Sequence, residues 1–187
     1  MKGVIFKQFE AFIVERFGDQ VFEQILDRTT LETQGPFVGP ATYPDSDLFA
    51  LVATAIEMAG LELDAALFAF GDFLYERLAA SIPGIVAAHS DVRSLLLALD
   101  RVIHVEVRKL MTDAETPRIA CEETGPDSLR VTYRSSRKLC PLFLGLLNAA
   151  ARSFGQRVQH DELACMHRGA DACVFELRFS SAAAIAA

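Results

Sequence analysis

The residues best suited to binding chemistry in this sequence lie together as Tyr-Arg-Ser-Ser-Arg at positions 133–137. In an extended strand Tyr133, Ser135 and Arg137 would share one face, and the residues that precede them on that face are apolar. Two hydroxyls and a guanidinium on an inward face are costly to bury unless an anion meets them. The pattern therefore predicts a site for an anionic group, although Arg137 could instead return to solvent or pair with an acidic side chain of the same protein.

A second candidate for chemistry is His104, which stands in the apolar context Val-Ile-His-Val. Neutral imidazole is the usual axial ligand of heme iron, and the two heme propionates are paired carboxylates that suit hydroxyl and guanidinium donors. Together, His104 and the 133–137 segment predict a heme site. Taken alone, His104 is more simply explained as a core residue that makes one hydrogen bond.

Three cysteines form a third candidate site. Cys140, Cys165 and Cys173, with His160 between the first two, supply the thiolate and imidazole groups that bind zinc tetrahedrally. The same residues also fit metal-free buried thiols, or a redox pair that forms a disulfide after metal loss. Cys121 falls outside the cluster, and we expect it to be an ordinary strand residue.

The elements that must position these residues change from helical to extended near Pro117. Apolar residues recur with helical spacing over about the first hundred residues. We expect these helices at residues 6–17, 45–58, 62–80 and 91–110. We expect strands at residues 118–123, 128–136, 155–160 and 173–179, the first two as a hairpin, and a helix that begins at Pro141. The fold class is α+β: a helical N-terminal part followed by a mostly antiparallel sheet with an inserted helix.

Composition limits the partners and the location of the protein. The 187 residues are 51% hydrophobic, which is enough for one domain, expected over residues 1–180 and followed by a flexible tail at 181–187. The net charge of −7 argues against binding to nucleic acid or to an anionic membrane. Without a signal sequence or a long apolar span, the chain is expected to be cytoplasmic. We find no catalytic triad, phosphate loop or clear carboxylate pair and expect no enzyme activity.

The sequence resembles the heme nitric oxide/oxygen binding (H-NOX) family, the bacterial relatives of the heme domain of soluble guanylate cyclase. The resemblance covers nearly the whole chain, and its most specific element is the signature Tyr-x-Ser-x-Arg at 133–137. It implies a heme b buried between the helices and the sheet. It also implies that Tyr133, Ser135 and Arg137 bind the propionates and that His104 is the proximal ligand of the iron.

The resemblance assigns further contacts to the heme. It implies that Pro117 packs against the porphyrin and bends it, and that Ile5 touches it from the N-terminal segment. Leu142 and Leu146, from the apolar stripe of the helix after the signature, are expected to line the same pocket. Oxygen-binding members carry a distal tyrosine where this chain has Leu142, so we expect a nitric oxide sensor that excludes oxygen. A hydroxyl from elsewhere, such as that of Tyr75, would change this expectation.

The resemblance also implies how a signal would leave the protein. Nitric oxide would release His104 from the iron and relax the heme, and the output would be a separate protein, typically a histidine kinase or a cyclic-di-GMP enzyme. Some members of the family bind zinc with three cysteines and one histidine. Cys140, Cys165 and Cys173 match those cysteines, but Glu162 stands at the histidine position, so His160 and His167 are the nearest substitutes.

A heme-free function is the alternative. The Cys-x7-Cys pattern with an internal glycine is also similar to small-molecule sensor domains called V4R, in which the same residues would hold zinc and an apolar ligand. Under that interpretation His104 is a core residue. It leaves the row of Tyr133, Ser135 and Arg137 unexplained.

Overall fold

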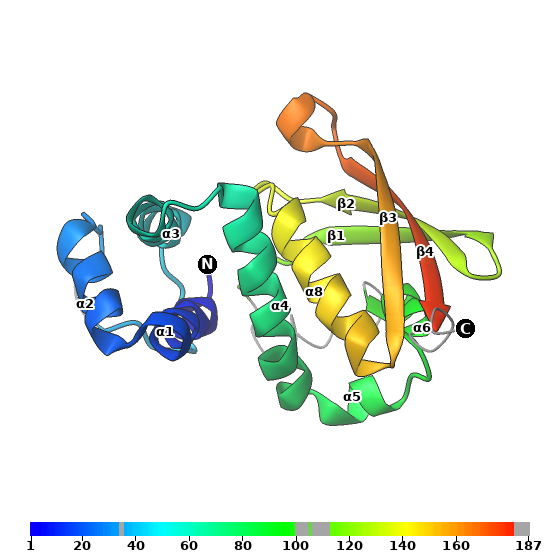
Figure 1. Ribbon diagram of the computed structural model, residues 1–187, viewed down its shortest axis with the longest axis horizontal. Helices are drawn as coiled ribbons and strands as arrows, with labels where there is room; N and C mark the ends of the chain where they lie inside the picture. The colour runs from blue at the N-terminus through cyan, green and yellow to red at the C-terminus, as the bar shows by residue number, and fades with distance from the viewer. Residues whose placement is uncertain (34–35, 100–104, 106–112, 182–187) are drawn as a thin grey trace.

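The computed structural model describes residues 1–33, 36–99, 105 and 113–181. Three layers follow one another in Figure 1: the N-terminal helices, a pair of long helices that lie side by side, and a sheet. The helices are α1 (Gly3–Phe17), α2 (Asp19–Arg28), α3 (Asp45–Ala59), α4 (Leu63–Ser81), α5 (Pro83–Ala87), α6 (Val92–Ala98) and α8 (Cys140–Ser153), with a 3-10 turn η2 (Met166–Arg168). The long pair is α4 and α8, so the middle layer combines segments from the two halves of the chain.

The sheet has four antiparallel strands in the order β1-β2-β4-β3. They are β1 (Arg118–Gly125), β2 (Ser128–Arg134), β3 (Gln156–Ala164) and β4 (Cys173–Ser181). In the two central strands alternate residues are fully buried, as expected for a sheet with one face against helices. Helix α8 lies between β2 and β3 in the chain, so the predicted α+β class with an inserted helix is confirmed.

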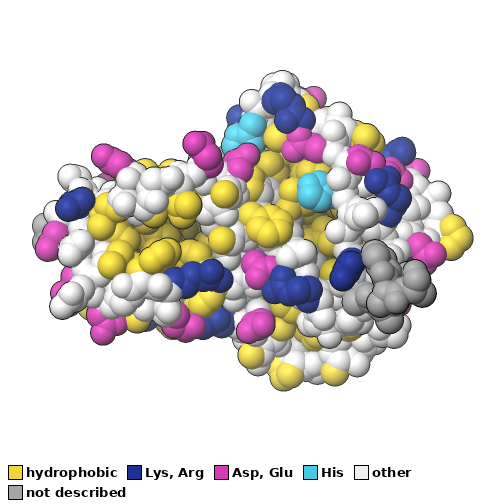
Figure 2. All heavy atoms as spheres, in the orientation of Figure 1, with side chains coloured by type: hydrophobic (Ala, Val, Ile, Leu, Met, Phe, Trp, Pro, Cys, Tyr) yellow, Lys and Arg dark blue, Asp and Glu magenta, His cyan; other side chains and the backbone are white. Residues whose placement is uncertain are grey.

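Two hydrophobic clusters share the long helices. One lies among α1 to α4 and is rich in phenylalanine, for example Phe6, Phe9 and Phe70. The other lies between α8 and the sheet and includes Phe143 and Phe175. In Figure 2 hydrophobic side chains gather over the N-terminal helices, where the surface is hollowed, and again over the region of α4 and α8.

Helices α4 and α8 cross closely because glycines stand at their contact. A Cβ atom on Gly71 would overlap the carbonyl oxygen of Leu142, and one on Gly145 would overlap the carbonyl oxygen of Phe68. Each glycine therefore lets the other helix's backbone approach. This approach sets the position of the α8 face that carries Leu142 and Leu146.

Some elements differ from the sequence prediction. Helices α2 and α5 were not anticipated as separate elements, and β3 continues to Ala164 rather than ending at residue 160. Most β3 side chains are exposed, so hydrophobic alternation could not mark its length. Of the helix expected over 91–110, the described part is α6, which begins where Asp91 Oδ1 accepts from Ser94 N at 2.7 Å.

Some expectations fall outside the described residues. His104 is one of them, and so is the tail from residue 182 onward. Among the residues that are described, no helix is both long enough and apolar enough to cross a membrane.

Candidate functional site

The signature residues are placed by a strand and by the turn that follows it. Strand β2 ends at Arg134, so the alternation that the sequence predicts holds for Tyr133 but not for Ser135 and Arg137. The turn is closed by a hydrogen bond from Lys138 N to Ser135 O at 3.1 Å, and Lys138 has a left-handed φ of 51°. We refer to residues 135–139 as the signature turn.

Tyr133 is a buried donor at the base of this turn. Its ring stacks on Phe143 with centroids 5.5 Å apart, and its hydroxyl is hydrogen-bonded to Ser135 and to the backbone of Leu139. Burial raises the pKa of Tyr133 to about 12. The phenol therefore keeps its proton at neutral pH and is available as a hydrogen-bond donor.

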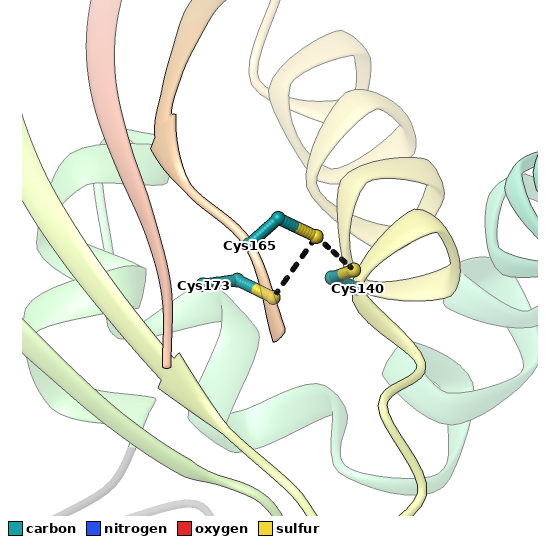
Figure 3. A group of neighbouring side chains, drawn as sticks. All are labelled: Cys140, Cys165 and Cys173. Atoms are coloured by element: carbon teal, nitrogen blue, oxygen red, sulfur yellow. Dashed lines mark hydrogen bonds between the residues drawn. The ribbon is translucent and has the colours of Figure 1, made fainter. Parts of the chain in front are cut away.

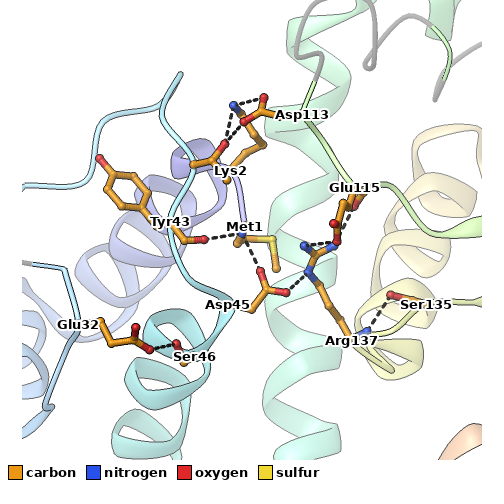
Figure 4. Close-up of polar contacts among 11 residues, drawn as sticks. Met1, Lys2, Glu32, Tyr43, Asp45, Ser46, Asp113, Glu115, Ser135 and Arg137 are labelled. Atoms are coloured by element: carbon orange, nitrogen blue, oxygen red, sulfur yellow. Dashed lines mark hydrogen bonds and ion pairs between the residues drawn. The ribbon is translucent and has the colours of Figure 1, made fainter.

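Arg137 points into a cluster of acidic groups rather than into solvent (Figure 4). Its Nε donates to Asp45 Oδ2 at 2.6 Å, and its terminal nitrogens donate to the carbonyl and to Oε2 of Glu115 at 2.9 and 3.1 Å. The side chain is only 11% exposed. The anion that the sequence requires is thus supplied here by two carboxylates of the protein itself.

Asp45 links the signature turn to the N-terminal segment. Its other oxygen accepts from the amine nitrogen of Met1 at 2.6 Å, and the same amine donates to Tyr43 O at 2.7 Å (Figure 4). Burial alone would raise the pKa of Asp45, but the hydrogen bonds from Arg137 and from the Met1 amine hold this pKa below its usual value. Asp45 is therefore an ionised bridge between α3, the first residue and Arg137.

Three of the four apolar residues assigned to the heme pack against one cluster. Ile5, Leu142 and Leu146 are partly buried and pack against the same N-terminal cluster. Pro117, also partly buried, directly precedes β1. His104 lies outside the described residues, so the ligand expected for the iron has no described position.

The donor set fits a heme chemically. The Arg137 guanidinium already donates to carboxylate oxygens. The Tyr133 hydroxyl, at the end of β2, is hydrogen-bonded to Ser135, whose own oxygen accepts from Arg137 N at 3.2 Å. Hydroxyl and guanidinium donors of this kind are what a propionate pair requires. Asp45 and Glu115 were not anticipated as partners of Arg137. Asp45 is 92 positions away in sequence, and nothing in the local pattern signals that contact.

The three cysteines of the second candidate site converge between α8, the end of β3 and the start of β4 (Figure 3). Cys165 Sγ lies 3.9 Å from Cys140 Sγ and 3.7 Å from Cys173 Sγ, and all three residues are at most 4% exposed. A tetrahedral zinc ion with Zn–S bonds of about 2.3 Å separates its sulfur ligands by about 3.8 Å. Two of the three sulfur separations therefore match those of zinc ligands, and all three sulfurs lie within 4.8 Å of one another.

The protonation of these thiols is governed by burial. Burial, together with the neighbouring thiols of Cys173 and Cys165, raises the pKa of Cys140. Burial likewise raises the pKa of Cys173, against the hydrogen bond that Met166 N donates to its sulfur at 3.3 Å. Without a cation these two groups are thus thiols at neutral pH, and a bound metal would displace their protons.

A pocket of about 250 Å³ opens beside this cluster. Its lining includes Cys140 and Cys165 together with the polar residues His160, Glu162, His167 and Arg168. His160 is exposed and sets its ring edge-on against Phe175, and His167 Nε2 contacts the Lys138 carbonyl at 2.7 Å. Within the described part of the chain, the three cysteines alone have ligand atoms close enough together for one metal ion. The structure therefore brings the cysteines together but does not bring His160 into their group.

The cysteine cluster and the signature turn are neighbours. Cys173 is the direct cross-strand partner of Tyr133 in the pairing of β2 with β4. Cys140 begins α8 immediately after the signature turn. A metal on the cysteines would therefore fix both ends of the segment that carries Ser135 and Arg137.

Comparison with known proteins gives consistent matches. A family model described as Haem-NO-binding matches residues 2–162. The H-NOX protein of Shewanella oneidensis in its Fe(II)NO state is 31% identical, with a TM-score of 0.90 over 97% of this chain and 100% of that one. The unliganded Fe(II) H-NOX protein of K. algicida is 27% identical, with a TM-score of 0.88 over 97% of each chain. The IWP-051-bound H-NOX of Shewanella woodyi is 25% identical, with a TM-score of 0.84 over 100% of this chain and 98% of that one.

Proposed function

The chain belongs to the Haem-NO-binding family, the H-NOX domains that sense gases through heme, and we propose that it senses nitric oxide, excludes oxygen and signals to a separate protein. The observation that carries the proposal is the arrangement of Tyr133, Ser135 and Arg137, in which a nearly buried guanidinium already binds carboxylate oxygens. The V4R-like alternative has no support from the matches.

The residues that hold the heme in this proposal are propionate donors, apolar contacts and an iron ligand. Arg137, Ser135 and Tyr133 donate to the propionates, so Arg137 exchanges or shares its present partners Asp45 and Glu115. The apolar contacts come from Ile5, Pro117, Leu142 and Leu146. His104 is the proposed iron ligand. When bound, the heme supplies the iron to which the gas binds.

Gas selectivity follows from the absence of a tyrosine hydroxyl near Leu142. The chain has three tyrosines. The Tyr133 hydroxyl is bonded within the signature turn, and that of Tyr43 accepts from Val38 N at 2.8 Å. The Tyr75 hydroxyl is 2.9 Å from Ser153 Oγ. Ser153 is eleven positions after Leu142 on α8, so the two residues are about 16 Å apart along the helix axis. This supports a pocket that gives bound oxygen no phenolic donor, while nitric oxide needs none.

The proposed signal requires two conformations of the chain that bind nitric oxide with different affinity. A nearly complete switch needs about 5.5 kcal/mol of difference. The link from Arg137 through Asp45 to α3 is a route by which a change at the heme edge would reach the N-terminal helices. The proposed receiver is a histidine kinase or a cyclic-di-GMP enzyme.

The test is the visible spectrum of the purified, reduced protein with heme supplied during expression. Nitric oxide should shift the Soret band, and air should cause only slow oxidation. His104→Gly should change the ferrous spectrum because it removes the proposed axial ligand. A colourless protein that takes up no hemin would refute the proposed heme site, and a stable, reversible spectral change in air would refute the exclusion of oxygen.

The proposal also includes a zinc ion on Cys140, Cys165 and Cys173. The sulfur spacing close to a tetrahedral edge supports it, as does the burial of all three thiols. Metal analysis of protein purified under reducing conditions should give about one zinc per chain. A metal-free protein with four titratable thiols, even after growth with added zinc, would refute this part.

A further inference from the structure

We propose that the carboxylate of Glu162 is the fourth ligand of the zinc ion, which makes an S3O site, and that Arg168 holds the second oxygen of that carboxylate. This inference rests on the zinc site proposed above. It places the ligand on β3 rather than on either of the histidines that line the pocket, His160 and His167.

The backbone of β3 directs Glu162 and Cys165 to the same side. Glu162 pairs with Phe175, but Ala164 pairs with Val174, so one extra residue of β3 is accommodated by a bulge between them. Continuing this register by one residue sets Cys165 opposite Cys173, which agrees with the 3.7 Å between their sulfurs. Cys173 and Phe175 are both buried on the inner face of β4, so their partners Cys165 and Glu162 lie on the same side of the sheet. Cys165 is buried there, whereas Glu162 lies on the edge strand with its side chain 27% exposed.

The bulge residue points the other way. Leu163 is 56% exposed, which shows that the residue between Glu162 and the cysteine end of the strand is turned outward. Glu162 is therefore the nearest residue of β3, on the same side of the sheet as Cys165, that can offer a ligand atom to a metal held by that cysteine. It lines the same pocket as Cys140 and Cys165.

Among the residues that the structure describes, only the three cysteines have ligand atoms close enough together for one metal ion, so Glu162, His160 and His167 would each have to turn towards it. The strand register and the present contacts of the two rings favour Glu162. His160 lies two residues farther from the cysteines on the same face, about 6.6 Å along the strand, and its ring contacts Phe175. His167 is exposed in the turn after Cys165, and its Nε2 is 2.7 Å from the Lys138 carbonyl. For His160 to bind the metal, its ring would have to leave Phe175. For His167 to bind, its ring would have to leave the Lys138 carbonyl or bind through its other nitrogen.

Charge also explains the presence of Arg168. Three thiolates and one carboxylate around Zn²⁺ leave a net charge of −2, which a nearby cation would partly offset. Arg168 donates to Glu162 in an ion pair, in which the Glu162 side chain is 27% exposed and the Arg168 side chain 65% exposed. A carboxylate has two oxygens, so one can bind the metal while the other keeps this hydrogen bond, as outer partners of metal ligands commonly do.

The test uses the full-length, heme-containing protein, because absorption at the zinc K-edge is separate from that of heme iron. The wild type should show three sulfur scatterers and one light atom, without the outer-shell scattering of imidazole. Zinc affinity, measured by competition with a chromophoric chelator, should fall at least about tenfold in Glu162→Gln and about tenfold in Arg168→Gln. Glu162→His should keep zinc and add the imidazole signal.

The matched controls are His160→Ala and His167→Ala, which should leave the zinc affinity and the sulfur count unchanged. Imidazole scattering in the wild type would overturn the assignment of Glu162 while leaving the zinc site in place. The same conclusion would follow if a histidine variant lost zinc and Glu162→Gln kept it. A wild-type chain that binds no zinc at all would refute the zinc site itself. The far-ultraviolet circular dichroism of each variant should match the wild type, so that loss of metal is not loss of fold.

Discussion

Arg137 Nε donates to Asp45 Oδ2 at 2.6 Å, across 92 positions of sequence, and this ion pair joins the signature turn to the first residue of α3. The Arg137 side chain is only 11% exposed, and its positive charge is balanced by this partner and by Glu115. A guanidinium held in this way is oriented before any ligand arrives. A carboxylate ligand would have to displace or share Asp45 and Glu115, but it would meet a guanidinium that is already oriented, so less side-chain freedom is lost on binding.

Replacing Arg137 should weaken heme retention more than it alters the fold. Arg137→Ala removes charge-assisted hydrogen bonds worth about 1.5–3 kcal/mol, which corresponds to about a 10- to 150-fold faster heme transfer to a scavenger protein. The heme transfer rate of Arg137→Lys should lie between those of wild type and Arg137→Ala, because an ammonium group cannot make a bidentate contact with a carboxylate. Arg134→Ala, exposed at the end of β2, is the control and should behave like wild type. Equal transfer rates in Arg137→Ala and wild type would contradict the assignment.

Leu142→Tyr should convert gas selectivity. A phenol at this position of α8 would supply the donor that the described tyrosines do not, and it should stabilise oxygen by about 1.5–3 kcal/mol if the hydrogen bond forms. The spectrum in air should then change rapidly and reversibly, while that with nitric oxide is nearly unchanged. Leu144→Tyr is the control, because Leu144 lines the pocket beside the cysteines instead. If Leu142→Tyr behaves in air as the wild type does, the distal position has been misassigned.

Alanine at the helix crossing should destabilise the protein although alanine favours helices. In Gly145→Ala the new Cβ would overlap the Phe68 carbonyl oxygen, and in Gly71→Ala that of Leu142, so a backbone must shift. Overpacking of this kind costs about 1–3 kcal/mol, which outweighs the gain of up to about 1 kcal/mol from helix propensity. Urea midpoints should fall in both variants. Gly84→Ala in α5, where a Cβ meets nothing within 4 Å, should leave the midpoint unchanged or raise it. A higher midpoint in Gly145→Ala would show that the helices separate without cost.

The sequence predicts the parts of this fold that depend on local periodicity. The bounds of α3 and α4 are within about a residue of the helices expected at 45–58 and 62–80, because both carry long apolar stripes. Strand β2 alternates as expected through Tyr133. The predictions fail where geometry is not local: the length of β3 depends on pairing with β4, and most of its side chains give no hydrophobic signal.

The candidate sites divide in the same way. The residue types at 133–137 and the three cysteines can be recognised from spacing, since their chemistry is unusual for buried positions. The turn that aims Arg137, with Lys138 at a positive φ, has no glycine to announce it. The contact of Arg137 with Asp45 and the bulge that brings Glu162 and Cys165 to one face are tertiary features. They follow from strand register and helix packing, which a single sequence does not specify.

The pH dependence of stability should include a contribution from Asp47 on α3. Asp47 is 1% exposed, and its two carboxylate oxygens accept from Glu32 N and Thr33 N at 2.8 and 3.0 Å. Burial alone would raise the pKa of Asp47, but these two hydrogen bonds and a third with the Thr33 side chain hold this pKa below its ordinary value. Its contribution is therefore fully present above the unfolded pKa of about 3.9 and is lost as the pH falls through the lower folded value.

Asp47→Asn should lower the free energy of unfolding by about 1–3 kcal/mol at pH 7, because the amide nitrogen cannot accept from a backbone N–H. Urea unfolding at pH 7, 5 and 3.5 should show the difference from wild type intact at the first two values and smaller at the third. Asp27→Asn, an exposed change on α2, should stay within about 0.5 kcal/mol of wild type throughout. A difference that grows as the pH falls would have the opposite sign to this expectation and would mean that Asp47 is protonated in the folded chain.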